Sequence, residues 1–95
     1  MLPVVFREIA AQEFSDTVLW YEQRRFGLGQ EFGLCVEAAL SLIQKQTLIG
    51  IPVSQGVRRL LIHRFPYGVY YRPHREHLEI IALRHFSRKP KTFST

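Results

Sequence analysis

The stretch RRLLIHRFPYGVYYRP, residues 58–73, is dense in side chains that bind anions or stack on rings. It carries several arginines, among them Arg58, Arg59 and Arg72, together with one histidine and three tyrosines. Guanidinium groups bind carboxylates and phosphates through paired N–H donors, so arginines gathered on one small sheet would form an anion-binding surface. Any single arginine near a strand end more commonly lies along the sheet and reaches solvent.

Further residues with possible chemistry follow near the end of the chain. Arg84 and Arg88 join the three arginines above if the late segments form neighbouring strands, and together they would bind a target or a partner protein. His85 is a candidate general base, although a lone histidine is more commonly structural. The four histidines and the single cysteine show no metal-ligand spacing, so we predict neither a metal nor a cofactor.

Length and charge narrow the class of protein. The chain has 95 residues, and we predict a single domain spanning 1–95 with one core. Lys and Arg number 13 against 8 for Asp and Glu, and the formal net charge of +5 favours polyanions or an acidic protein as partners. One cysteine excludes an internal disulfide, and no apolar run approaches the roughly 18–20 residues of a membrane span. We therefore predict a cytoplasmic protein with no membrane partner.

The first half of the chain is predicted to be helical after one short strand. Residues 3–8 begin with proline and continue with β-branched and aromatic residues, which favours a strand. Apolar residues at helical spacing predict helices over about 9–25 and 29–46. Gly27 lies between them and is suited to the left-handed conformation that ends a helix. The short connection makes the two helices an antiparallel hairpin.

The second half is predicted to be rich in β-structure. Residues 47–56 contain Gly, Pro and Ser and predict a loop. Three β-prone runs follow over 57–63, 67–72 and 77–85, and their short connectors indicate an antiparallel meander. The last run is apolar on both faces from 78 to 83, so it is central or is covered by another chain. The predicted fold class is α+β with the order β-α-α-β-β-β, a two-helix antiparallel hairpin packed on a mainly antiparallel four-stranded sheet.

Three stretches in this order carry a family resemblance: WYEQRRFGLGQEF (20–32), VRRLLIHRFPYGVYY (57–71) and LRHFSRKP (83–90). The chain resembles the RelE/ParE toxin superfamily over nearly its whole length and is closest to the ParE-like branch. Members of that branch typically show Trp-Tyr-Glu, Gly-Leu-Gly, Arg-Phe-Pro-Tyr and a His-x-x-Arg near the end. The resemblance implies a type II toxin of a plasmid-stabilisation system, held inactive in a hetero-oligomer by a cognate antitoxin whose extended, often acidic segment wraps the toxin.

The superfamily divides between two toxic activities. RelE-like members cleave messenger RNA in the ribosome with basic residues and often a C-terminal tyrosine or histidine, and under this alternative Arg59, Arg84 and His85 would be catalytic. ParE-like members poison DNA gyrase without an established hydrolytic site. For a binding protein of this kind, the arginines would instead contact the antitoxin or the target.

This sequence departs from the nucleolytic pattern in two places. Gly68 follows Tyr67 where the nucleases commonly carry arginine, and glycine contributes no charge to a scissile phosphate. Phe93 stands where a tyrosine hydroxyl would be expected, and it has no proton to exchange. We therefore interpret the chain as a ParE-like inhibitor of DNA gyrase rather than an enzyme. The alternatives are a RelE-like messenger RNA endoribonuclease and a degenerate, non-toxic family member that binds an antitoxin.

Overall fold

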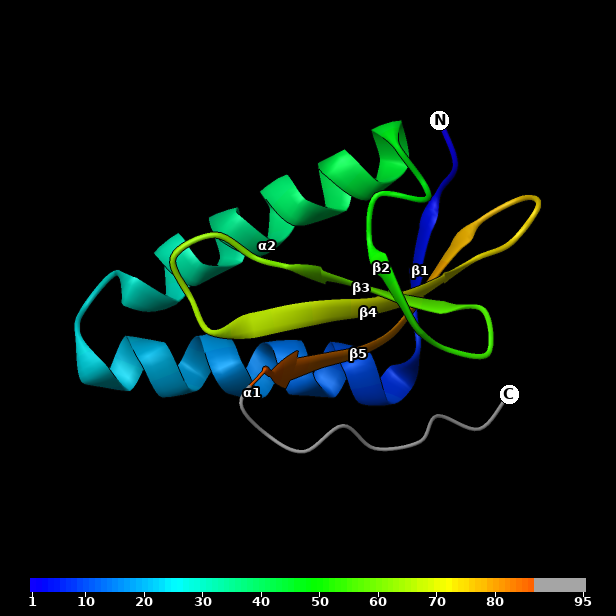
Figure 1. The fold of residues 1–95 in the computed structure, drawn as a ribbon. Helices are drawn as coiled ribbons and strands as arrows, with labels where there is room; N and C mark the ends of the chain where they lie inside the picture. Colours follow the sequence, from blue (N-terminus) through cyan, green and yellow to red (C-terminus); the bar gives the residue numbers. More distant parts are fainter. Residues whose placement is uncertain (87–95) are drawn as a thin grey trace.

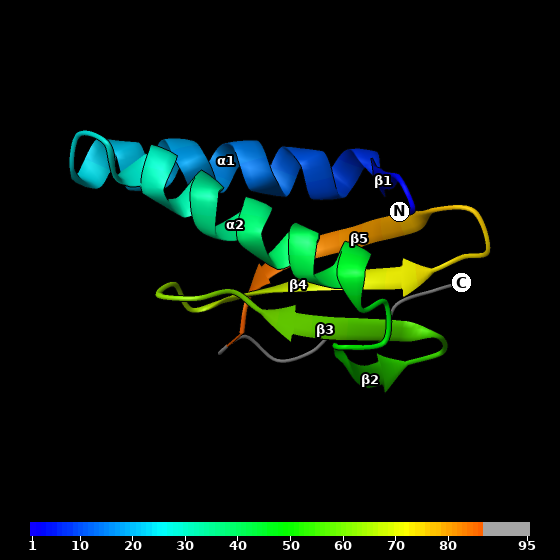
Figure 2. The ribbon, with the colours of Figure 1, turned by 90° about the horizontal axis from the view of Figure 1, so that it is seen from above.

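The computed structural model describes residues 1–86. The elements follow in the order β1 (Val4–Phe6), α1 (Glu8–Arg24), α2 (Leu28–Lys45), β2 (Ile51–Ser54), β3 (Val57–Leu61), β4 (Tyr67–Pro73) and β5 (Leu78–His85). Both helices lie on the same side of a five-stranded sheet, as Figures 1 and 2 show. The α+β class, the helical hairpin and the late meander are confirmed, with element boundaries within two residues of those predicted.

The sheet has one strand more than predicted. Its strand order is β1-β5-β4-β3-β2, in which β1 runs parallel to β5 and every other neighbouring pair is antiparallel. The prediction of a loop over 47–56 was wrong because this stretch contains β2. Ile51 and Val53 are β-branched and favour a strand. Pro52 lacks an N–H donor, but β2 is an edge strand, where a missing donor is tolerated.

The main core lies between the helices and the sheet. Phe32 of α2 is completely buried, and its ring centroid lies 5.1 to 5.4 Å from those of Tyr21, Phe65 and Tyr67. Aromatic pairs at this spacing contribute roughly 0.5–1.5 kcal/mol beyond their buried area. This cluster fixes α1 and α2 against the β3–β4 connection, and so it positions the residues at that end of the sheet.

A second, smaller cluster lies on the sheet face turned away from the helices. It consists of Val57, Tyr70, Ile81 and Ala82, each no more than 5% exposed. A bulge shifts the β4–β5 register between Tyr70 and Tyr71, which puts Ile81 and Ala82 together on this face instead of alternating. The second apolar face of β5 is therefore buried within the chain, and its pattern does not by itself indicate a partner.

The Glu22 carboxylate fixes the junction between the two helices. It accepts hydrogen bonds from the backbone N–H groups of Gly27 (2.8 Å) and Gly29 (3.0 Å), which satisfies donors at the start of α2. Gly27 has the predicted left-handed conformation with φ +86°. A Cβ atom on Gly29 would lie 2.5 Å from the carbonyl oxygen of Val18, so glycine is required for the close approach of the helices.

Candidate functional site

The structure places the predicted basic residues of β3 and β4 on both faces of the sheet. Arg58 pairs in register with Tyr71, whose side chain belongs to the main core, so Arg58 lies on the face covered by the helices. Arg59 pairs with Tyr70 of the second cluster and lies on the opposite face, which it shares with Arg72. The thickness of the sheet therefore separates Arg58 from the other two arginines.

Arg58 and Tyr71 together hold the segment between α2 and β2. The Nη1 atom of Arg58 donates to the carbonyl oxygens of Leu48 (3.1 Å) and Gly50 (2.8 Å). The Tyr71 hydroxyl accepts from the N–H of Gly50 and donates to the carbonyl oxygen of Thr47, both at 2.9 Å. Burial raises the pKa of Tyr71, opposed by the hydrogen bond from Gly50 and the charge of Arg58. These contacts satisfy the polar backbone of a loop and give Arg58 a structural role.

The side chain of Arg59 extends over Gly68, a diagonal neighbour on strand β4. A Cβ atom on Gly68 would lie 3.0 Å from Cγ and 3.1 Å from Cδ of Arg59, so the aliphatic stem of the arginine occupies the space above the glycine. The Nε atom of Arg59 is buried and has no hydrogen-bond partner among residues 1–86. Gly68 pairs on its other side with Arg84, and therefore Arg59 and Arg84 belong to strands that flank the glycine.

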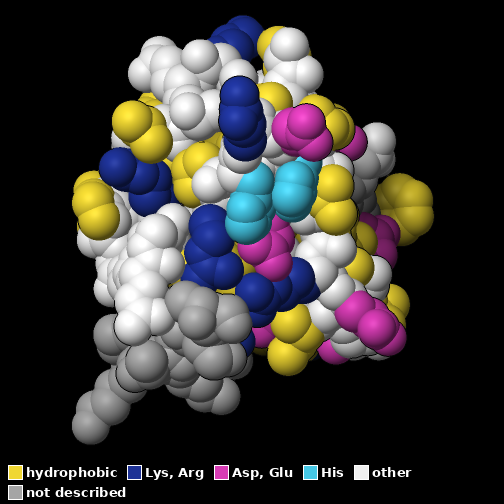
Figure 3. All heavy atoms as spheres, turned by 90° about the vertical axis from the view of Figure 1, so that its right-hand side faces the viewer, with side chains coloured by type: hydrophobic (Ala, Val, Ile, Leu, Met, Phe, Trp, Pro, Cys, Tyr) yellow, Lys and Arg dark blue, Asp and Glu magenta, His cyan; other side chains and the backbone are white. Residues whose placement is uncertain are grey.

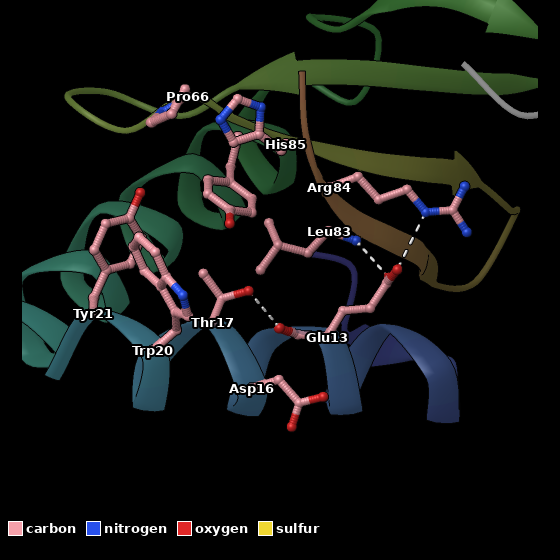
Figure 4. Close-up of a pocket in the computed structure, with 10 residues that line it drawn as sticks. Glu13, Asp16, Thr17, Trp20, Tyr21, Pro66, Leu83, Arg84 and His85 are labelled. Carbon is pink, nitrogen blue, oxygen red and sulfur yellow. Dashed lines mark hydrogen bonds and ion pairs between the residues drawn. The ribbon is translucent and has the colours of Figure 1, made fainter. Parts of the chain in front are cut away.

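Glu13 of α1 covers the part of β5 that β1 does not reach. Its Oε1 atom accepts the backbone N–H of Leu83 at 3.0 Å, and its Oε2 atom accepts from Nε of Arg84 at 3.2 Å, as Figure 4 shows. An unpaired strand edge otherwise presents open donors and acceptors to other chains. The carboxylate thus satisfies a donor on this edge and pairs with one of the predicted site residues.

A hollow of about 620 Å³ opens between α1 and the end of β5. Figure 4 shows side chains from both elements converging on it, with Pro66 of the β3–β4 connection above them. Its lining consists of Glu13, Asp16, Thr17, Trp20, Tyr21, Pro66, Tyr67, Leu83, Arg84 and His85. Two of the predicted catalytic residues, Arg84 and His85, are therefore brought together here, whereas Arg59 does not line the hollow.

Four aromatic rings form one part of the wall of the hollow, those of Trp20, Tyr21, Tyr67 and His85. The ring of Tyr67 lies 5.3 Å from that of His85 and 6.2 Å from that of Tyr21. Burial, and to a lesser degree the nearby Tyr67, raises the pKa of Tyr21, so this hydroxyl stays protonated above its usual range. Trp20 is 47% exposed, and the guanidinium of Arg24 lies over its ring, 3.8 Å from the ring centroid, in a cation–π contact. Such walls suit a flat apolar or aromatic group brought by a partner.

The remaining predicted arginines lie elsewhere. Arg72 donates from Nη2 to the carbonyl oxygen of Gln55 at 3.3 Å, and its Nη1 atom lies 3.7 Å from the carboxylate of Glu79 at the far end of the sheet from the hollow. Arg88, predicted to bind a partner, and Phe93, which stands where a tyrosine would be expected, lie outside the described residues.

Within residues 1–86, no three His, Cys, Asp or Glu side chains are grouped so that they could hold a metal ion. In the same part of the chain, neither helix has the length and apolar character needed to cross a bilayer.

Comparison with known proteins gives a structural likeness. No protein-family model matches the chain, and no curated protein sequence matches it. A solved structure described as the chromosomal ParDE TA system from P. aeruginosa matches with a TM-score of 0.74. The match is 17% identical in sequence and covers 90% of this chain and 96% of the other. This chain has a ParE-like fold.

The Arg-Phe-Pro-Tyr motif has an architectural role in this fold. Arg64 adopts a left-handed backbone conformation with φ +73°, which residues other than glycine rarely adopt. Its Nη2 atom pairs with Glu31 of α2 at 2.9 Å, and Arg25 pairs with the same carboxylate at 3.1 Å. Hydrogen bonds from Arg64 first, and from Arg25 second, lower the pKa of Glu31. The motif thus connects the β3–β4 turn to the helices and positions Tyr67 at the hollow.

Sequence reasoning missed the acidic side of the hollow in this ParE-like fold. Glu13, Asp16, Thr17 and Trp20 are spaced three, one and three residues apart in α1, which brings them to one face of the helix. That spacing is visible in the sequence, but only the packing of α1 on β5 shows which strand the face meets.

Proposed function

We propose that this ParE-like chain is the toxin of a type II toxin–antitoxin system, that it acts in the cytoplasm, that a cognate antitoxin neutralises it, and that it inhibits DNA gyrase. The observation that carries the proposal is the fold likeness to a structure of a ParDE system, with a TM-score of 0.74 over 90% of the chain. The net charge of +5 supports an acidic partner.

The surroundings of Gly68 support gyrase inhibition over RNA cleavage. The nucleolytic branch of the superfamily that this chain resembles commonly has an arginine at this position of the strand. Here the stem of Arg59 fills the space that a Cβ atom would need, so this backbone position supplies no cation of its own. A scissile phosphate at this position would therefore lack one of the cations that stabilise the transition state in the nucleolytic pattern.

A second candidate function, ribosome-dependent messenger RNA cleavage, is favoured by one observation. Arg84 and His85 both line the hollow, and the ring of His85 lies 5.3 Å from that of Tyr67, so the walls carry a cation, an imidazole and a phenol. These groups suit proton transfer and charge stabilisation. Arg84 is paired with Glu13, however, and this pairing reduces the positive charge that it offers to a phosphate.

Inducible expression of the chain, with and without the neighbouring reading frame, tests both candidates. We expect growth inhibition that the neighbouring frame relieves, loss of gyrase supercoiling in the presence of purified protein, and intact ribosome-bound messenger RNA. Codon-specific cleavage that disappears in His85→Ala would instead establish the ribonuclease. A folded chain that binds the neighbouring protein but leaves growth and supercoiling unchanged would be a non-toxic family member and would contradict the proposal.

Antitoxin binding has a separate test. If the charge excess guides the encounter, the association rate should fall steeply as salt is added, since screening weakens long-range attraction. An association rate that does not depend on salt would argue against the basic side chains as the docking surface.

A further inference from the structure

A charged cluster lies at the end of the sheet opposite the hollow, and the proposed function does not use it. Its centre is Glu79 of β5, which accepts a hydrogen bond from Nε of Arg7 at the start of α1. The same carboxylate lies 2.7 Å from Nε2 of His74 and 3.7 Å from Nη1 of Arg72. One carboxylate is thus shared by two guanidiniums and an imidazole from three different parts of the chain.

Two histidines of the β4–β5 hairpin stack directly on one another in this cluster. The ring centroids of His74 and His77 lie 4.4 Å apart, with an interplanar angle of 13°. The N–H of His74 donates to the carbonyl oxygen of His77 at 2.8 Å, which fixes the backbone that carries both rings. Figure 3 shows two histidine side chains side by side at this end of the molecule, next to an acidic side chain and bordered by basic ones.

The charges of this cluster do not balance. Two guanidiniums, those of Arg7 and Arg72, against the Glu79 carboxylate leave a charge of +1, and protonation of both imidazoles raises it to +3. Arg75 and Glu76 of the same hairpin cancel one another in charge. Burial would raise the pKa of Glu79, but hydrogen bonds from its neighbours outweigh that effect and lower it, so the carboxylate stays ionised near neutral pH.

The cluster is accessible to a ligand from solvent. The side chains of Arg7 and His74 are 35% and 37% exposed, while Arg72 is 15% exposed and held in place by the carbonyl oxygen of Gln55. Two stacked imidazolium rings repel each other, and the Glu79 carboxylate touches only one of them. A second anion would relieve this repulsion and would meet the N–H groups of these side chains that do not already bind Glu79 or Gln55.

We propose that Arg7, Arg72, His74 and His77 form a phosphate-binding site that fills as the two histidines become protonated. A phosphate group presents several acceptor oxygens and can bridge donors that converge from separate elements, whereas a carboxylate presents two. The binding of one anion is coupled to the uptake of protons, because the charged rings and the anion stabilise each other. This inference goes beyond the proposed toxin activity and does not rest on it.

Calorimetric titration of the full chain with inorganic sulfate tests the site, because sulfate is a tetrahedral anion whose charge stays fixed over the range in which histidine titrates. At constant ionic strength, we expect affinity to be at least about tenfold higher near pH 5.5 than near pH 7.5, since each coupled proton changes affinity by up to about tenfold per pH unit. His77→Gln should reduce this difference because only His74 is left to take up a proton, and the double variant His74→Gln with His77→Gln should abolish it. His63→Gln, the same change at an exposed histidine outside the cluster, should preserve it.

A short oligothymidylate, titrated in parallel, distinguishes the source of the phosphate. Stronger binding of the oligonucleotide, lost in the double variant, would identify a nucleic-acid backbone, and equal binding per anion would identify a free phosphate. Binding that is independent of pH, or that survives in the double variant with unchanged thermal stability, would overturn the proposal. Preference for an acidic peptide over both probes would also overturn it, since the ligand would then be a carboxylate.

Discussion

The adjacent arginines of β3 are expected to have opposite effects on stability when each is replaced by methionine. Methionine keeps an unbranched apolar stem and removes only the guanidinium, so the comparison isolates the polar contacts. In Arg58→Met, the carbonyl oxygens of Leu48 and Gly50 each lose a charged donor, at 3.1 and 2.8 Å. In Arg59→Met, the buried Nε atom without a partner disappears.

The magnitudes follow from these contacts. Hydrogen bonds to charged groups contribute roughly 1.5–3 kcal/mol when they are sheltered from water. The bond from Arg58 to Gly50 is partly buried, but the bond to Leu48 is exposed and contributes less, so we expect Arg58→Met to lower the free energy of unfolding by about 2–3 kcal/mol. We expect Arg59→Met to leave it unchanged or to raise it by up to about 1 kcal/mol, because an unsatisfied buried polar atom is removed.

Urea unfolding of both variants and the parent, followed by circular dichroism, measures the difference. The midpoint should fall for Arg58→Met with an unchanged slope, and the effect of the double variant should equal the sum of the two single effects within about 0.5 kcal/mol. Antitoxin binding and toxicity, compared at a temperature where every variant is folded, should weaken only where Arg59 is changed. Equal destabilisation by the two substitutions, or loss of binding in Arg58→Met alone, would refute this assignment of roles.

Two further predictions concern the helix junction and the response to alkali. Gly29→Ala should destabilise the chain by roughly 1–3 kcal/mol in thermal unfolding, because its Cβ would meet the Val18 carbonyl oxygen at 2.5 Å. Gly33→Ala, the control in the same helix, has space for its Cβ and should stabilise the chain by up to about 1 kcal/mol. Equal effects of the two substitutions would contradict the close approach of the helices. Burial raises the pKa of Tyr71 above 10.0, so its contribution to stability is complete below the unfolded pKa and is lost as pH rises through the folded one. The free energy of unfolding should therefore decline above about pH 10, and less steeply in Tyr71→Phe; a decline identical in that variant would exclude Tyr71 as a cause.

The helices and late strands could be predicted because each carries its periodicity within its own residues. The edge strand β2 could not, since its composition is that of a loop and its pairing with β3 decides its conformation. The bulge at Ile81 is likewise invisible in a sequence that alternates on both faces. Strict alternation would have put Ile81 and Leu83 on one face, but the extra residue places Leu83 in the main core and Ile81 in the second cluster.

The site was harder to predict because its contacts join residues far apart in the chain. Alternation correctly separated Arg58 from Arg59, but only the Tyr71 hydroxyl and the loop before β2 show which of them is held by the fold. Glu13 lies 70 residues from Leu83, whose N–H it accepts, and no local pattern connects them. Positions of charged residues are readable in a sequence, whereas their partners depend on the packing of α1 against β5.

The relation between Arg59 and Gly68 couples two positions that a sequence comparison treats as separate. An arginine at position 68, as in the nucleolytic pattern, would bring its Cβ to within 3.0 Å of the Arg59 stem. Contacts this short require the stem of Arg59 to shift by a few tenths of an ångström, so the present position of Arg59 depends on the glycine at 68. A side chain introduced at position 68 would therefore move the stem of Arg59 as well as occupy the space above the strand. Glycine at 68 and the placement of Arg59 are one structural feature, and the charge presented beside Arg84 depends on both.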